Sequence, residues 1–188
     1  RQGLIHRDLK PENIMMLDDA SGRHTLKVLD FGLAKLAGSG SAGPQLTKTG
    51  AVFGTPQYMA PEQAMGEEAD ARTDLYALGV ILFQGLTGAL PFDSDNVLSL
   101  LQAHVAEPLP DLPPDVAPAL AAVVRKALAK PKDERFADAA AMATALTAAR
   151  DAAARRTLPG GLGDSAGVPV PDSVAVAPTL GPEAVGDA

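Results

Sequence analysis

The pattern of apolar and polar positions predicts a short β-hairpin, a long loop and then a helical body. Two apolar runs, residues 14–17 and 25–29, flank a segment rich in turn formers, residues 18–23, and this arrangement is typical of a hairpin. Residues 33–59 are rich in Gly, Ser and Thr and only weakly apolar, which predicts a long loop. Residues 73–156 carry apolar positions at mainly helical spacing and predict α-helices.

The first of these helices differs from the others in how its apolar residues are distributed. Residues 73–86 are apolar on nearly every side, which is typical of a fully buried helix. We expect Thr73 or Asp74 near its start and Gly88 just past its end. Three further helices are predicted at residues 96–105, 118–128 and 136–156, and Asp138 is the expected N-cap of the last.

The amino-acid composition of the chain changes after residue 156. Residues 157–188 are rich in Pro, Gly, Val and Ala, carry acidic residues and contain no Lys or Arg. Such a segment cannot bury enough apolar surface to offset the entropy of ordering it. We therefore predict a folded domain over residues 1–156 and a disordered linker over residues 157–188.

Composition narrows the possible functions. The chain has 188 residues, a formal net charge of −7 and no Cys. The absence of Cys excludes disulfides and thiolate metal sites, and the negative charge argues against nucleic acid as the main partner. No apolar run approaches the length of a membrane span.

A cluster of reactive side chains lies near the start of the chain, in His6-Arg7-Asp8-Leu9-Lys10-Pro11-Glu12-Asn13. Asp8 can accept a proton from a hydroxyl, and Lys10 can stabilise negative charge that develops during a reaction. Asn13 and the later Asp30 offer oxygen ligands that suit Mg²⁺. The predicted hairpin would bring these two residues together, since Asn13 precedes one strand and Asp30 follows the other.

These motifs resemble those of the protein kinase superfamily. The run at residues 6–13, then Asp30-Phe31-Gly32, then Ala60-Pro61-Glu62 resembles a catalytic loop, a metal-binding turn and the end of an activation segment. Lys10, two residues after Asp8, is typical of the Ser/Thr type, and the composition is similar to bacterial members. The resemblance implies an α+β protein-kinase-like fold, of which this chain would hold the mainly α-helical C-terminal lobe and a small β-hairpin.

The resemblance also implies a small N-terminal lobe ahead of the catalytic loop, with a glycine-rich loop and a strand lysine. Only residues 1–5 precede the loop here. We therefore interpret the chain as a large-lobe fragment with the N-terminal lobe absent, and we expect it to be inactive alone.

The same resemblance implies a mechanism and its cofactors. The reaction would be transfer of the ATP γ-phosphoryl to Ser or Thr hydroxyls of proteins. Asp8 would orient the hydroxyl, and Thr55 would hydrogen-bond both Asp8 and Lys10. Lys10, Asn13 and Asp30 would contact the nucleotide, and Asn13 and Asp30 would hold Mg²⁺, with Mn²⁺ as an alternative.

Four further residues receive structural roles by resemblance. His6 would pack beneath the metal-binding turn and steady the loop. Asp74 would accept backbone N–H groups of the catalytic loop. Glu62 would pair with Arg135, far along the chain.

Regulation is expected in the long loop. Thr47 or Thr49 would be phosphorylated, and the added charge would be bound by Arg7 and Lys35. The choice between the two threonines stays open, and a plain solvated loop is the alternative.

Two rival functions remain. The first is a non-catalytic kinase-like scaffold or partner-binding module. The second is a small-molecule phosphotransferase, which shares a similar catalytic loop but lacks the segment around Gly54-Thr55-Pro56. The expected partners of the kinase are protein substrates and its own N-terminal lobe, with no membrane contact by this segment. The expected location is the cytoplasm, and a membrane anchor elsewhere in the full-length protein is an alternative.

Overall fold

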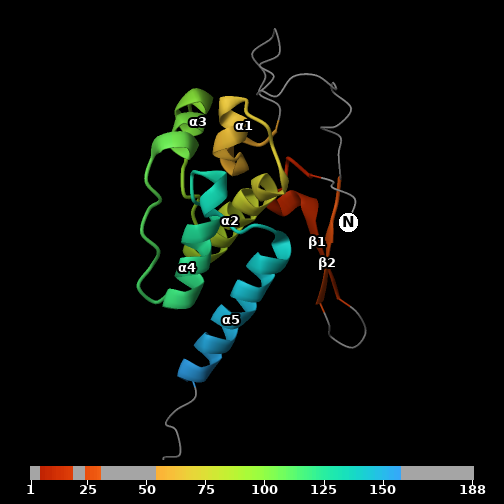
Figure 1. The fold of residues 1–188 in the computed structure, drawn as a ribbon, viewed down its shortest axis with the longest axis vertical. Coiled ribbons are helices and arrows are strands. Elements are labelled where there is room, and N and C mark those ends of the chain that lie inside the picture. The colour runs from red at the N-terminus through yellow and green to blue at the C-terminus, as the bar shows by residue number, and fades with distance from the viewer. Residues whose placement is uncertain (1–4, 19–23, 31–53, 158–188) are drawn as a thin grey trace, which may run out of the picture. The chain divides into compact units, whose positions relative to one another are not determined.

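The computed structural model describes residues 5–18, 24–30 and 54–157 (Figure 1). These residues are mostly helical and contain one two-stranded antiparallel sheet. In chain order the elements are η1 (Pro11–Asn13), β1 (Ile14–Asp18), β2 (His24–Val28), η3 (Pro56–Tyr58), α1 (Pro61–Met65), α2 (Ala71–Thr87), α3 (Val97–Ala106), α4 (Pro118–Ala127), η4 (Lys132–Glu134) and α5 (Ala139–Thr157).

The predicted hairpin is present as β1 and β2. The strands pair in register from Ile14 opposite Val28 to Asp18 opposite His24, within one residue of the predicted bounds. Beyond the ladder, the N–H of Leu29 donates to the carbonyl of Asn13 at 2.8 Å. This bond holds the end of β2 beside the residue that precedes β1.

Helix α2 begins earlier than the sequence predicts. The sequence predicts the helix over residues 73–86 with Thr73 or Asp74 near its start, but Asp70 is the N-cap and Ala71 the first helical residue. The Asp70 carboxylate accepts the N–H of Arg72 at 2.8 Å, while the Thr73 hydroxyl accepts the N–H of Asp70 at 3.2 Å. This reciprocal capping box satisfies donors that would otherwise be unpaired. The helix ends as predicted, with Gly88 in the left-handed conformation at φ +76°.

Helix α2 is central to the core, but the expectation that it is buried on all sides is wrong in part. It packs against α4, α5 and η3 (Figure 1), and Tyr76 and Val80 are fully buried. Leu78 and Ile81 are only half-buried and Gly85 is exposed. The described elements therefore cover one side of α2 more completely than the other.

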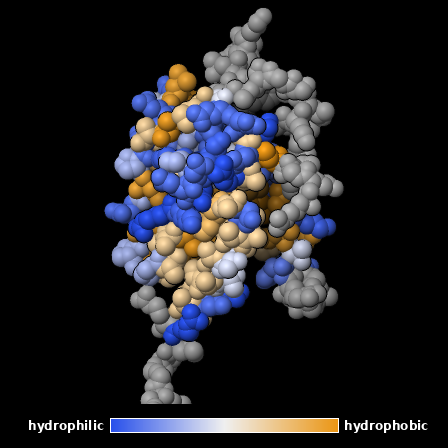
Figure 2. All heavy atoms as spheres, in the orientation of Figure 1, coloured by the Kyte–Doolittle hydropathy of each residue, from blue (hydrophilic) through white to orange (hydrophobic). Residues whose placement is uncertain are grey.

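The remaining helices lie within a few residues of their predicted bounds. The Asn96 side chain caps α3 by accepting the N–H groups of Leu98 and Ser99. Asp138 accepts the N–H of Ala141 at 2.8 Å at the start of α5. Figure 2 shows mildly apolar residues over the region where Figure 1 places α5. This agrees with the many alanines of that helix. Among the described residues, no helix combines the length and apolar character that spanning a membrane requires.

Two glycines of α2 provide a test of this packing. A Cβ on Gly79 would lie 2.9 Å from the Cβ of Ala127, whereas a Cβ on Gly85 would meet no atom within 4 Å. We expect Gly79→Ala to destabilise the domain by about 1–3 kcal/mol through overpacking. Gly85→Ala should stabilise it by about 0.5–1 kcal/mol, because alanine favours helix over glycine. Urea denaturation of both variants measures the difference, and equal effects would contradict the α2–α4 contact.

Candidate active site

The loop of residues 5–10 is anchored to the first turn of α2. Asp74 accepts the backbone N–H of His6 at 2.8 Å with one carboxylate oxygen and that of Arg7 at 2.9 Å with the other. Backbone donors bonded to a charged acceptor form strong hydrogen bonds. A carboxylate at the end of a largely apolar helix therefore fixes the loop that carries the reactive side chains.

His6 supports the loop from within. Its side chain is buried, its Nε2 bonds the carbonyl of Leu29 at 2.8 Å, and its Nδ1 accepts the N–H of Asp8 at 3.3 Å. A carbonyl acceptor on one side and an N–H donor on the other select the tautomer with its proton on Nε2. The ring thus ties the loop to the residue before Asp30.

Three of the predicted reactive residues are brought together. The backbone N–H of Thr55 donates to Oδ1 of Asp8 at 3.1 Å, and Nζ of Lys10 donates to the Thr55 hydroxyl at 2.8 Å. Nζ of Lys10 also lies 3.6 Å from Oδ2 of Asp8. Thr55 was expected to hydrogen-bond both residues; it contacts Asp8 through its backbone N–H and Lys10 through its hydroxyl. Both charged side chains stay accessible, with Asp8 33% and Lys10 25% exposed.

Gly54 permits this approach of Thr55. Its φ of +105° is unfavourable for residues with a Cβ, and a Cβ there would lie 3.4 Å from Cε of Met59. A Cβ would also lie 3.9 Å from Oδ1 of Asp8. Both distances are ordinary van der Waals contacts, so glycine is favoured before Thr55 by its backbone conformation and not by a lack of space.

Asn13 and Asp30 suit a hard cation by their chemistry. The Asn13 amide donates through Nδ2 to the carbonyl of Asp8 at 2.8 Å, so its oxygen keeps its lone pairs for a metal. Asp30 directly follows Leu29, whose N–H donates to the Asn13 carbonyl, and so lies two residues beyond the hairpin ladder. An exposed carboxylate and an oriented amide oxygen at the same end of the hairpin match the oxygen preference of Mg²⁺.

Two residues of this region have left-handed backbone conformations. Arg7 has φ +68° and Asp30 has φ +57°. Such conformations cost about 1–2 kcal/mol for residues other than glycine. They are the only non-glycine residues with positive φ in the described part of the chain, and strain of this kind is concentrated at functional sites.

Glu62 and Arg135 form a buried ion pair away from the loop. Two nitrogens of Arg135 donate to the two carboxylate oxygens at 2.8 Å each, and the Thr73 hydroxyl adds a third bond at 2.8 Å. Burial acts to raise the pKa of Glu62, but the hydrogen bonds and charge of Arg135 outweigh it and hold that pKa below its ordinary value. The pair joins α1 to the segment after η4.

Several predicted residues cannot be placed. Lys35, Thr47 and Thr49 lie outside the described residues, as do Phe31 and Gly32 of the predicted metal-binding turn and residues 158–188 of the predicted linker. Arg7 is exposed, and its guanidinium makes no hydrogen bond or ion pair within the described ranges. Its predicted role as a phosphate ligand therefore stays a prediction.

Gln63 is a residue that the sequence analysis missed. Its side chain donates to the carbonyl of Arg7 at 2.9 Å and accepts the N–H of Ala60 at 3.1 Å. A glutamine at the third position of a helix is a known cap residue, and this was the only available sign. Nothing local in the sequence indicates its contact with the loop.

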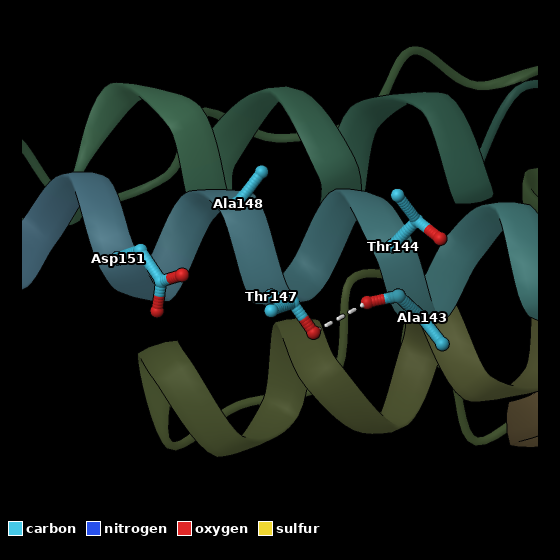
Figure 3. Close-up of a pocket in the computed structure, with 5 residues that line it drawn as sticks. All are labelled: Ala143, Thr144, Thr147, Ala148 and Asp151. Carbon is cyan, nitrogen blue, oxygen red and sulfur yellow. Dashed lines mark hydrogen bonds between the residues drawn. The ribbon is translucent and has the colours of Figure 1, made fainter.

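A shallow pocket on α5 lies apart from these residues. It is lined by Ala143, Thr144, Thr147, Ala148 and Asp151, all from one helix (Figure 3). The hydroxyl of Thr147 donates to the carbonyl of Ala143 at 2.9 Å, within the helix itself. The pocket contains none of the predicted reactive side chains, and we place the candidate site at the catalytic loop.

Comparison with known proteins places the chain in a family. The family model described as "Protein kinase domain" matches residues 1–146. Serine/threonine-protein kinase Pkn1 of Myxococcus xanthus is 46% identical over 168 residues, which cover 86% of this chain and 24% of the relative. Serine/threonine-protein kinase pkn3 of the same organism is 46% identical over 153 residues, covering 78% and 28%.

Serine/threonine-protein kinase PknB of Mycolicibacterium smegmatis is 47% identical over 148 residues, which cover 76% of this chain and 22% of the relative. The chain thus spans about a quarter of the length of these curated relatives. Since the family model matches more than half of the chain, and does so over the residues that hold Asp8, Lys10 and Asn13, this chain belongs to the protein kinase domain family.

Proposed function

We propose that this chain is the C-terminal lobe of a serine/threonine protein kinase. As part of a longer protein it transfers the γ-phosphoryl of ATP to Ser or Thr hydroxyls of protein substrates. The observation that carries this proposal is the contact of Thr55 with both Asp8 and Lys10. It joins a base, a cation and the segment before Ala60-Pro61-Glu62 into one accessible group.

Asp8 prepares the nucleophile in the proposed reaction. With Oδ1 held by the N–H of Thr55, the carboxylate keeps lone pairs that orient the substrate hydroxyl and accept its proton. The hydroxyl oxygen forms a bond to the γ-phosphorus while the bond to the bridging oxygen of ADP breaks. Lys10 stabilises the negative charge on the moving group.

Asn13 and Asp30 are the residues that would hold Mg²⁺, with Mn²⁺ as a substitute. The ion supplies charge neutralisation and alignment of the nucleotide phosphates when it is bound. The protein's part is to fix the ligands in place. The Asn13 amide does this through its bond to the Asp8 carbonyl, which couples the metal ligand to the base.

Activation and organisation complete the proposal. Phosphorylation of Thr47 or Thr49 would add negative charge that Arg7 and Lys35 can bind. The kinase lobe extends to the end of α5 at Thr157, one residue beyond the predicted boundary, and the remainder of the chain serves as a linker. The kinase domain acts in the cytoplasm, where ATP is available, and requires an N-terminal lobe in the same chain.

Mass spectrometry of the full-length protein incubated with ATP and Mg²⁺ tests this function. We expect phosphate on Ser or Thr of an added protein substrate and on Thr47 or Thr49, because the site is built for a hydroxyl acceptor. EDTA should abolish the modification, since removal of the metal leaves the phosphate charge unneutralised. No transfer with Mg²⁺ or Mn²⁺ present, together with retained binding of protein partners, would favour the scaffold alternative.

A further inference from the structure

A side chain of α1, that of Gln63, hydrogen-bonds the catalytic loop. The amide of Gln63 donates from Nε2 to the carbonyl of Arg7 at 2.9 Å and accepts the N–H of Ala60 at Oε1, at 3.1 Å. Arg7 and Gln63 are 56 positions apart in the sequence. One amide therefore bridges the start of α1 and the backbone beside Asp8.

The peptide unit between Arg7 and Asp8 is held at both ends. Gln63 binds its carbonyl oxygen, and Nδ1 of His6 accepts its N–H at 3.3 Å. Arg7 has φ +68°. The backbone N–H of Arg7 donates to the Asp74 carboxylate at 2.9 Å. A left-handed conformation of this kind persists only where the surroundings fix it. Gln63 contributes the contact on the carbonyl side.

We propose that Gln63 is a positioning residue for the base Asp8, acting through the Arg7–Asp8 peptide. This inference rests on the proposed kinase function and extends it. The direction in which the Asp8 side chain leaves the backbone depends on the orientation of that peptide. By holding its carbonyl, Gln63 makes the geometry of the base depend on the placement of α1, which closes the activation segment.

The alternative is that Gln63 only caps α1. Ala60 has no side-chain oxygen, so the bond from its N–H to Gln63 is the one side-chain contribution to capping at this helix start. The two roles use different atoms of the amide: Oε1 caps the helix and Nε2 holds the loop. Glutamate keeps the oxygen and lacks the donor, so Gln63→Glu separates them.

Steady-state kinetics of the full-length protein test the proposal. In Gln63→Glu the cap is retained, and we expect kcat to fall by about tenfold, since a carboxylate replaces the donor facing the Arg7 carbonyl. KM for ATP and the melting temperature should change little. Gln63→Met, which removes both bonds without adding charge, should lower kcat similarly and also lower the melting temperature. Gln102→Glu, the same change at an exposed position of α3, is the matched control and should leave kcat unchanged.

A wild-type kcat in both Gln63 variants would overturn the positioning role. If the melting temperature then fell only in Gln63→Met, capping of α1 would be the sole role of Gln63. Hydrogen exchange at the Asp8 amide gives a second reading that needs no catalysis. We expect faster exchange in both Gln63 variants than in the wild type and in Gln102→Glu, and equal exchange would also overturn the proposal. A wild-type protein without phosphoryl transfer would reject the proposed function, while the exchange comparison would still decide whether Gln63 holds the loop.

Discussion

Asp8→Asn in the full-length protein is expected to lower kcat by about 10²–10⁴-fold, the range attributed to a positioned general base. Asparagine has the same shape, and its oxygen can still accept the N–H of Thr55 that now binds Oδ1 at 3.1 Å. It cannot take a proton from the substrate hydroxyl, and it removes the negative charge 3.6 Å from Lys10. The loss should therefore fall on catalysis and leave the fold intact.

Radiolabelled phosphate transfer to a protein substrate, measured beside the melting temperature, checks this expectation. Asp111→Asn is the matched control because its carboxylate is fully exposed and lies 4.0 Å from Arg125. The control should keep wild-type kcat. A kcat for Asp8→Asn within a few-fold of wild type would remove Asp8 from the role of base, whatever its contacts.

The proximity of three candidate site residues was predictable because they are close in sequence. Asp8, Lys10 and Asn13 lie within six positions, and a hairpin sufficed to bring the residue before Asp30 to Asn13. The periodicity of apolar residues likewise predicted the helices of the second half. Local patterns determine local structure, so these inferences needed no knowledge of long-range packing.

Interactions between distant segments were predictable only where the family resemblance supplied them. The contacts of Asp74 with the catalytic loop and of Glu62 with Arg135 cross 67 and 73 positions, and no spacing in the sequence implies them. Gln63 belongs to the same class, but no motif marks it. The start of α2 was misplaced for another reason, since Asp70 and Asp74 are both plausible caps until the packing of Thr73 is known.

Several of the long-range contacts meet at α1, beside those that Asp74 of α2 makes with the loop. Glu62 joins it to Arg135 and to Thr73 of α2, while the neighbouring Gln63 joins it to Arg7. Two consecutive side chains of one short helix therefore connect the core to the catalytic loop. Because a helix of five residues is not stable alone, its position depends on these contacts, and the buried ion pair is the strongest of them.

Arg135→Met is accordingly expected to destabilise the domain by about 3–5 kcal/mol, the cost of removing one partner of a buried pair. The Glu62 side chain is 2% exposed, so its charge would be left without compensation. Arg135 also donates to the carbonyls of Ala129 and Lys130 at 2.7 and 2.8 Å, and these would lose their partner. Arg125→Met, at an exposed arginine 4.0 Å from Asp111, should cost less than about 1 kcal/mol.

The pH dependence of the free energy of unfolding distinguishes the loss of the ion pair from the loss of packing. In the wild type the pKa of Glu62 lies below its ordinary value of 4.5, so the pair stabilises the fold above that value and the contribution is lost as the pH falls through the lower folded pKa. In Arg135→Met the lowering by Arg135 is lost, and burial, the largest influence, raises the pKa of Glu62 against the remaining bond from Thr73. Acid then protonates the buried carboxylate and relieves its cost. Urea denaturation should therefore show a wild-type advantage at pH 7 that narrows as the pH falls towards and below 4.5. An advantage that stays constant across this range would mean that Arg135 stabilises the domain by packing and carbonyl contacts alone.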